Sequence, residues 1–257
     1  MLNFNIKHTN YLLTKPFPHI IFDNILNDDI AHEIQKEILD ISDDKFDRYD
    51  NPFEQKWTLR DKNNLPKKCT ELFEYLVSEE CLLKLSELVG IKLLNDSTKN
   101  FWGIHKYNHG DKLDIHVDAG IHPISKLKKE LTLGIYLSKN WKEEYGGCLE
   151  IWEGENSKNN DAKLIECKNK IVPQFNRMVI FSCTDDAWHG NPDPVKCDKD
   201  SQRIFLTMSY LSERIEFENK RQKAYFVKLP NELEDEEKDK LRILRADSEK
   251  YKEVYRI

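Results

Sequence analysis

A chain of 257 residues is long enough to bury a substantial core, as one large domain or two small ones. Hydrophobic residues make up 39% of it and charged residues 33%, and no stretch approaches the roughly 20 apolar residues that a membrane-spanning helix needs. The formal net charge of −6, with Lys and Arg spread among the acids, disfavours broad contact with nucleic-acid phosphates.

The N-terminal residues lack the basic start and apolar run of a secretory signal, so we expect a cytoplasmic protein with no membrane partner. The six cysteines form no C-x-x-C pair. Without a signal peptide they are expected to be reduced, mostly buried thiols, although spacing alone leaves a scattered zinc site open.

Residues 1–95 are predicted to be mainly helical. Residues 17–22 indicate a short strand, and Asn27 is a suitable N-cap for a helix with an apolar stripe at Ile30, Ile34 and Ile38. A polar stretch follows at 42–64. A second helix is expected to start after Pro66 and to end at Gly90.

Residues 96–215 change character, because short segments rich in Val, Ile, Phe, Tyr and Thr alternate with loops containing Gly, Pro, Asn and Asp. Such spacing predicts an antiparallel sandwich or barrel, with a jelly roll as its closed two-sheet form. The candidate strands are 101–107, 113–117, 131–137, 148–152, 178–182 and 204–210.

Residues 216–257 are dense in charge and are predicted to be a C-terminal extension. Residues 231–245 could form a solvated helix that touches the body through Leu233, Leu241 and Leu244. An exposed polar face or a loose tail is an equally good interpretation.

A candidate metal site begins at His116-Val-Asp118, which ends a predicted strand. Residues i and i+2 of a strand project to one face, so the imidazole and the carboxylate can meet one ion. The triplet alone is weak evidence, but His189 follows another predicted strand. Two imidazoles and one carboxylate form the facial triad of non-haem iron(II) oxygenases, and zinc accepts the same ligands.

Arg203 stands at the start of the apolar strand 204–210. Burying a guanidinium is costly unless it meets an anion, and its planar fork suits a carboxylate. The partner could be a ligand or an internal Asp or Glu. Among the other histidines, His105 is expected to be structural, whereas His109 and His122 lie in loops and are expected to be solvated.

Six motifs occur in an order that resembles the iron(II)/2-oxoglutarate oxygenases, and within them the prolyl 4-hydroxylase-like branch. The resemblance covers about residues 101–212, and its motifs are 107–118, 131–141, 146–152, 173–181, 188–190 and 203–207. It implies a double-stranded β-helix with the N-terminal helices packed on the larger sheet. It also implies that residues 1–257 form one oxygenase domain, with 1–95 as helical support, 96–215 as the core and 216–257 as the extension.

The resemblance also implies the roles of the site residues. Iron(II) would be held by His116, Asp118 and His189, and Arg203 would bind the distal carboxylate of 2-oxoglutarate. In the same pocket, Tyr136 and Thr207 would donate hydrogen bonds. Tyr107 would lie at the mouth of the pocket, and Leu149 would form part of its apolar wall. Either tyrosine could instead be an ordinary buried aromatic residue.

The implied reaction consumes oxygen and 2-oxoglutarate and hydroxylates a substrate, with ascorbate as a candidate reductant. Two departures leave the substrate open: many collagen-type relatives carry Lys where this chain has Arg203, and residues 153–170 form a long polar segment, predicted as a loop.

We predict hydroxylation of a prolyl residue of a protein or peptide. Hydroxylation of a free amino acid or sugar-linked metabolite is the alternative, and an inactive jelly-roll metal-binding module is a third. A zinc hydrolase lacks a clear general base. The oligomeric state is not indicated.

Overall fold

The computed structural model describes residues 2, 9–158, 161–214, 221–247 and 249–250. Its helices are α1 (Asp28–Leu39), α2 (Lys67–Leu76), α3 (Glu79–Val89) and α4 (Glu236–Ala246). Its strands are β1 (His19–Asp23), β2 (Asp47–Asn51), β3 (Glu54–Leu59), β4 (Gly103–Tyr107), β5 (Lys112–Val117), β6 (Lys128–Tyr136), β7 (Leu149–Gly154), β8 (Leu164–Ile171), β9 (Arg177–Ser182), β10 (Trp188–Asn191), β11 (Arg203–Ser212) and β12 (Tyr225–Phe226).

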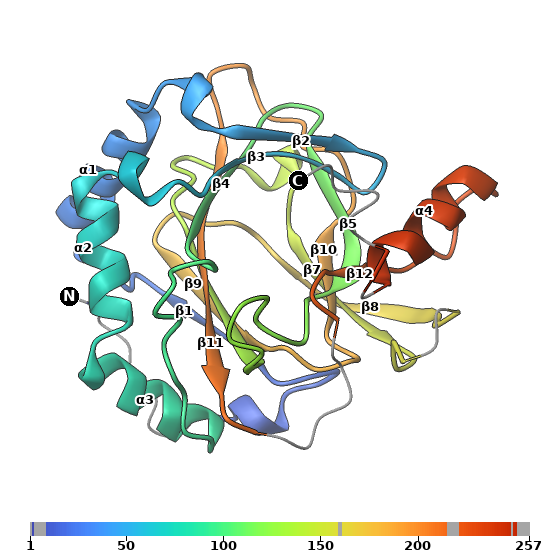
Figure 1. Cartoon of the computed structure of the whole chain (residues 1–257). Coiled ribbons are helices and arrows are strands. Elements are labelled where there is room, and N and C mark those ends of the chain that lie inside the picture. Colours follow the sequence, from blue (N-terminus) through green and yellow to red (C-terminus); the bar gives the residue numbers. More distant parts are fainter. Residues whose placement is uncertain (1, 3–8, 159–160, 215–220, 248, 251–257) are drawn as a thin grey trace.

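The strands form one strongly curved antiparallel sheet that bends round a central space (Figure 1). Its order is β1-β9-β6-β11-β4-β3-β5-β10-β7-β8, with β2 on β3 and β12 on β5. The half formed by β1, β9, β6, β11 and β4 faces the half formed by β5, β10, β7 and β8, and β3 bridges them by pairing with both β4 and β5. This arrangement is the predicted double-stranded β-helix.

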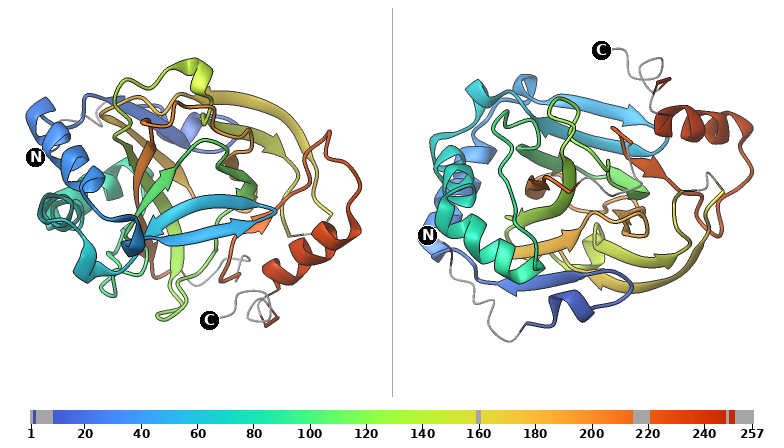
Figure 2. Two further views of the ribbon diagram at one scale, coloured as in Figure 1. Left: turned by 90° about the horizontal axis from the view of Figure 1, so that it is seen from above. Right: turned by 60° about the horizontal axis from the view of Figure 1, so that its bottom comes forward.

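The N-terminal helices cover the larger half of the sheet, as expected (Figure 2). Side chains along a strand alternate between two faces. In β11, the apolar residues of one face, Ile204, Leu206 and Met208, pack in one core with residues of α1, α2 and α3. The other face carries Arg203, Phe205 and Thr207 into the interior of the barrel. The two faces of one strand therefore separate the core from the site.

The first two helical segments begin and end largely where the sequence indicates. The Asn27 side chain caps α1 by accepting from the Asp29 N–H at 3.0 Å. The single helix expected between Pro66 and Gly90 is in fact two helices, because Ser78 leaves the helical conformation and caps α3. Gly90, at φ +70°, ends α3 in the left-handed conformation.

Two polar segments in which no strand was predicted contain strands. Residues 42–64 contain the β2–β3 hairpin, and residues 153–170 contain most of β8, which pairs with β7. Both were missed because their strands are polar: Glu54 and Lys56 are buried in β3 as an ion pair with a 3.0 Å Oε2–Nζ distance. An ion pair facing the inside of a barrel cannot be distinguished from solvated charge by sequence periodicity alone.

The most deeply buried polar side chains of the C-terminal helix are arginines, while Leu241 and Leu244, two of the three leucines expected to touch the body, are half-buried. Leu233 is 86% exposed, whereas Arg242 and Arg245 are buried. Arg242 Nη2 donates to Glu232 Oε1 at 2.7 Å, and Arg245 bonds the Glu54 carboxylate of β3. Helix α4 lies on the side of the barrel away from α1–α3 (Figure 1). None of the described helices combines the length and the apolar character needed to cross a bilayer.

Candidate active site

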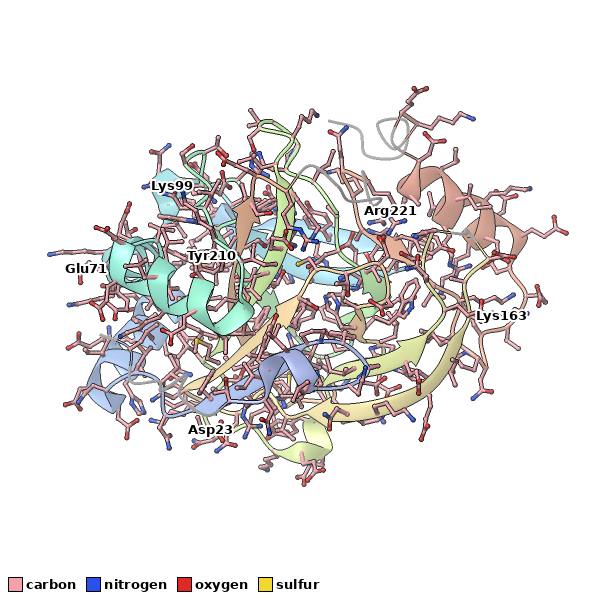
Figure 3. The ribbon with its side chains drawn as sticks, turned by 90° about the horizontal axis from the view of Figure 1, so that it is seen from below. Asp23, Glu71, Lys99, Lys163, Tyr210 and Arg221 are labelled. Atoms are coloured by element: carbon pink, nitrogen blue, oxygen red, sulfur yellow. The ribbon has the colours of Figure 1, made fainter. Side chains whose placement is uncertain are left out.

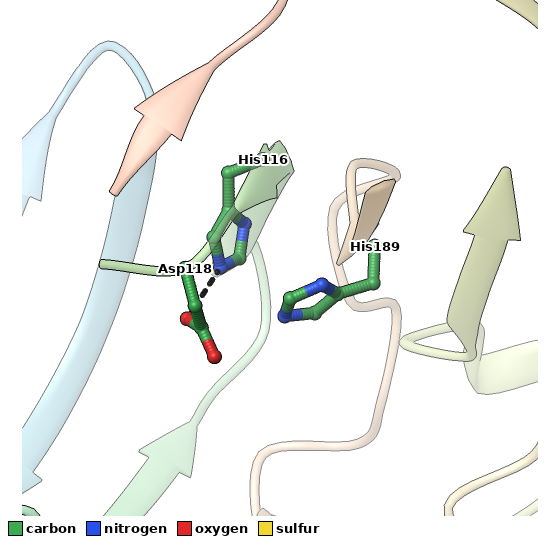
Figure 4. Close-up of side chains that lie close together, drawn as sticks. All are labelled: His116, Asp118 and His189. Carbon is green, nitrogen blue, oxygen red and sulfur yellow. Dashed lines mark ion pairs between the residues drawn. The ribbon is translucent and has the colours of Figure 1, made fainter. Parts of the chain in front are cut away.

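Neighbouring strands bring the three predicted ligand residues together. β5 and β10 are antiparallel, and His116 lies directly opposite His189 in their register. Asp118 follows β5 two residues after His116. One ligand atom from each residue lies within 4.8 Å of the other two. Figure 4 shows the three side chains converging on one point.

Backbone carbonyls orient both imidazoles. His116 Nδ1 lies 2.9 Å from Asp114 O, and His189 Nδ1 lies 2.8 Å from Ala187 O. A carbonyl only accepts, so each Nδ1 must carry the proton and donate. Each Nε2 therefore keeps a lone pair facing the other ligands, which is the usual arrangement of metal-binding histidines.

The Asp118 carboxylate is held by its inner neighbours. Its Oδ2 accepts from Lys129 Nζ at 2.7 Å and from Thr132 Oγ1 at 2.9 Å, while Oδ1 lies 3.7 Å from His116 Nε2. Burial opposes ionisation, but the Lys129 ammonium and the imidazoles hold the pKa of Asp118 well below its usual range. Burial and His116 lower the pKa of His189 to about 3, although Asp118 opposes this shift. A charged carboxylate and a neutral imidazole are the protonation states that a divalent metal requires.

Arg203 is buried at the start of β11 with an incomplete set of partners. Its Nε donates to Gly147 O at 2.7 Å, and its Nη2 lies 3.5 Å from the Tyr136 hydroxyl. The guanidinium lies 4.6 Å from the Tyr107 ring centre. Among the described residues, its Nη1 has no hydrogen-bond partner and no carboxylate forms an ion pair with it. The alternative of an internal acidic partner is therefore not supported within the described residues.

The Gly146-Gly147 turn explains how Arg203 is positioned. Gly147 has φ +65°, and a Cβ there would lie 3.0 Å from both Arg203 Cδ and Val195 Cγ2. Glycine thus lets the backbone approach the arginine closely enough for the Gly147 carbonyl to accept from its Nε.

One cavity of about 550 Å³ contains the whole predicted set. Burial raises the pKa of Tyr136 to about 12, so its hydroxyl stays protonated near neutral pH and can donate. Among the described residues, Thr207 makes no hydrogen bond with Arg203, and Phe205 lies between them along β11. The predicted residues that line this cavity are Tyr107, His116, Asp118, Tyr136, Leu149, His189, Arg203 and Thr207.

Comparison with known proteins identifies the family. Residues 102–211 match the family model described as the 2OG-Fe(II) oxygenase superfamily. These residues of the chain form a 2OG-Fe(II) oxygenase domain. No match was found among curated protein sequences.

Solved structures show that the fold of this oxygenase is prolyl-hydroxylase-like. A Pseudomonas putida prolyl-4-hydroxylase aligns over 79% of this chain and 95% of its own, with 13% identity and a TM-score of 0.58. A Trichoplax adhaerens prolyl hydroxylase, solved with a hypoxia inducible factor peptide fragment, aligns over 79% of this chain and 87% of its own, with 19% identity and a TM-score of 0.52. At these identities the likeness concerns the fold.

The residues of the oxygenase fit the cofactors of its family. Two Nε2 atoms and one carboxylate oxygen form a mixed nitrogen and oxygen donor set, which suits iron(II) and leaves positions open. The unpartnered Nη1 of buried Arg203 fits a ligand carboxylate. When bound, iron(II) supplies the redox chemistry of oxygen, and the protein supplies orientation and exclusion of water.

Several residues that surround the site were not predicted from the sequence. Thr132 could have been found, because it alternates with Leu131 and Leu133 in a predicted strand. Lys129 lies just before that predicted strand, so it could not be assigned to a face. Phe226 comes from β12, beyond every motif, yet its ring centre lies 5.1 Å from that of His116. No signal in residues 216–257 indicated this contact.

The remaining histidines differ in part from expectation. His122, predicted to be solvated, is fully buried, with its Nε2 3.3 Å from Asp96 Oδ1. Its Nδ1 accepts from the backbone N–H groups of Ile124 and Ser125, so it stabilises its own loop. His109 is exposed, as expected. His105 lines the cavity, where burial lowers its pKa well below the usual range.

Proposed function

We propose that the enzyme hydroxylates a prolyl residue of a protein or peptide. In this proposal His116, Asp118 and His189 hold iron(II), and Arg203 anchors the distal carboxylate of 2-oxoglutarate. The observation that carries it is the meeting, in one cavity, of a complete ligand triad and a buried arginine with an unpartnered nitrogen. The fold likeness to two prolyl hydroxylases supports the choice of substrate.

Each remaining residue then has a role at a stated atom. Lys129 and Thr132 occupy Oδ2 of Asp118, so that Oδ1 faces the metal position. Tyr136 Oη donates to the co-substrate carboxylate beside Arg203, and Thr207 provides a second hydroxyl. Tyr107 stacks on the guanidinium, and Leu149 excludes water from the apolar wall. We further propose that residues 1–257 act as one domain, because side chains from both 102–211 and 221–247 line the same cavity.

Anaerobic reconstitution tests the first part of this proposal. Iron(II) and 2-oxoglutarate added together should produce a weak metal-to-ligand absorption band that neither produces alone. Its absence from a folded, iron-loaded sample would refute the site assignment.

A substrate screen tests the second part. Proline peptides and small metabolites should be incubated with iron(II), 2-oxoglutarate and oxygen, and scored by a mass gain of one oxygen. We expect hits among the proline peptides. Hits confined to free amino acids or sugar-linked metabolites would favour the small-molecule alternative, and no succinate with any compound would favour an inactive module.

A further inference from the structure

One buried amide on β10 has no hydrogen-bond partner for its nitrogen. Asn191 is 2% exposed, and its Nδ2 makes no hydrogen bond within the described residues. Asn191 lines the same cavity as His189, which precedes it by two residues on the strand. An amide N–H that is buried without an acceptor is destabilising, and a ligand that supplies the acceptor removes that cost. In this respect Asn191 resembles Arg203, whose Nη1 is also buried and unpartnered.

The strand register defines two neighbouring rows of side chains on this wall of the cavity. The first row contains the predicted ligands, because His189 pairs with His116 of β5. The second row is centred on Asn191, which pairs with Leu113 of β5. Positions two residues apart on a strand are separated by about 7 Å. Asn191 therefore lies one row from the histidines, and its Nδ2 does not bond either of them.

The second row leads toward Arg203. At one end of the row, Leu113 packs against Tyr107, whose ring centre lies 4.6 Å from the Arg203 guanidinium. At the other end, the β7–β10 register continued by one residue places Leu149. Leu149 is two residues from Gly147, whose carbonyl accepts from Arg203 Nε. Both ends of the row are thus next to the groups that hold the arginine.

We propose that Asn191 binds the co-substrate, with its Nδ2 donating a hydrogen bond to an oxygen of the 2-oxo acid group of 2-oxoglutarate. The inference rests on the proposed function, in which the triad and Arg203 hold opposite ends of that molecule. A ligand that reaches from one to the other passes the row of Asn191. The distal carboxylate has donors in Arg203 and Tyr136, whereas the 2-oxo acid group has no protein donor assigned to it. The free amide is therefore assigned to that group.

Anaerobic titration of the iron(II) protein tests the contact at each end of the ligand. 2-Oxopentanoate keeps the 2-oxo acid group but has a methyl group in place of the distal carboxylate. Asn191→Leu should raise the Kd of both compounds by about tenfold or more, as expected for loss of a hydrogen bond to a charged acceptor. Arg203→Met should raise the Kd of 2-oxoglutarate only. The absorption band that accompanies chelation measures these values.

Stability separates a binding role from a structural one. Leucine has a branched shape similar to that of asparagine and lacks the buried amide, so Asn191→Leu should leave the Tm of the ligand-free protein unchanged or raise it. Asn191→Ala, which cannot overpack the wall, should raise both Kd values in the same direction. Iron(II) affinity without ligand should equal that of the wild type. Weaker ligand binding that appears only together with loss of iron(II) would assign Asn191 to the support of His189 and overturn the proposal.

The matched control is Tyr210→Phe, which also removes a buried polar group. The Tyr210 hydroxyl donates to Leu76 O of α2 at 3.0 Å. Figure 3 shows Tyr210 beside the N-terminal helices, on the core face of the sheet. Because this hydroxyl has a partner, its loss should lower the Tm and leave both Kd values unchanged.

The outcomes separate this inference from the proposed function. If an ordered water or the substrate is the partner of Asn191, both Kd values stay at those of the wild type, and only the inference is overturned. An increase for 2-oxoglutarate without one for 2-oxopentanoate also overturns it, because Asn191 would then serve the distal carboxylate. If the wild type gives no band with either compound, the proposed site fails, and the inference that rests on it fails as well.

Discussion

The replacement Arg203→Met gives the most direct test of the co-substrate site. The guanidinium is buried, and its Nη2 has only a 3.5 Å contact with Tyr136. Its Nη1 has no partner among the described residues. Two nitrogens are thus available to a ligand carboxylate. Methionine fills much of the same volume without charge, so the change removes those donors and leaves the cavity packed.

The expected size of the effect follows from these two contacts. A hydrogen bond to a charged group contributes about 1.5–3 kcal/mol, and two to one carboxylate are not fully additive. A loss of about 2–4 kcal/mol corresponds to an increase of roughly 30- to 1000-fold in the Kd of 2-oxoglutarate. Anaerobic titration of the iron(II) protein, followed by absorption, measures this Kd directly.

A second arginine provides the control. Arg177 on β9 donates to both oxygens of Asp23, at 2.6 and 2.9 Å, so its partner is internal. Arg177→Met should lower stability without changing the Kd of 2-oxoglutarate. The reasoning fails if Arg203→Met changes that Kd by less than about threefold, or if both variants change it equally.

Three further predictions concern the metal ligands, the glycine turn and the buried ion pairs of Glu54. His189→Ala should abolish succinate formation, measured by mass spectrometry, while the exposed His109→Ala should retain it; full activity of the first variant would remove His189 from the triad. Gly147→Ala should destabilise the fold by about 1–2 kcal/mol in chemical unfolding, because alanine is strained at φ +65°, and it should raise the KM for 2-oxoglutarate by displacing Arg203; wild-type values for both would contradict this. Burial opposes ionisation of Glu54, but its two cationic partners hold its pKa far below the usual range, so its stabilisation is present above about pH 4.3 and is lost as the pH falls. Glu54→Gln should therefore lower stability at pH 7 and flatten the acid limb of the pH–stability curve, and an unchanged limb would refute the linkage.

The apolar part of the fold could be predicted from the sequence because buried apolar residues recur at a regular spacing along each helix and strand. All six strands expected in residues 96–215 are present, and the alternation in β11 places Ile204 and Leu206 in the core. The observed strand ends differ from the predicted ones by a few residues where strand pairing extends beyond the apolar run. An example is β6, which begins at Lys128. The break between α2 and α3 could not be predicted, because Leu76 and Leu82 continue one apolar pattern across Ser78.

The positions of the candidate site residues could also be predicted, but their surroundings could not. A strand places His116 and Asp118 on one face whatever the rest of the chain does. His189 and Arg203 were singled out by the predicted strands beside them, and the family resemblance supplied their roles. The contacts of Asp118 with Lys129 depend on how β6 and β5 meet in three dimensions, and no local pattern encodes that meeting. Long-range polar contacts are therefore the least predictable part of the site.

Sequence reasoning failed in the charged segments for a physical reason. Charge inside a barrel must be matched by charge from another element, so the ions of β3 are completed by Arg245 of α4, which is distant in sequence. Docking of α4 leaves Phe226 against His116 and Lys223 at the cavity. A helix that looks like a solvated tail thus fixes the wall of the cavity. Mutations on the inner face of α4 should therefore alter substrate preference before they alter 2-oxoglutarate binding, because Arg203 is held by β11 and the Gly147 turn and not by α4.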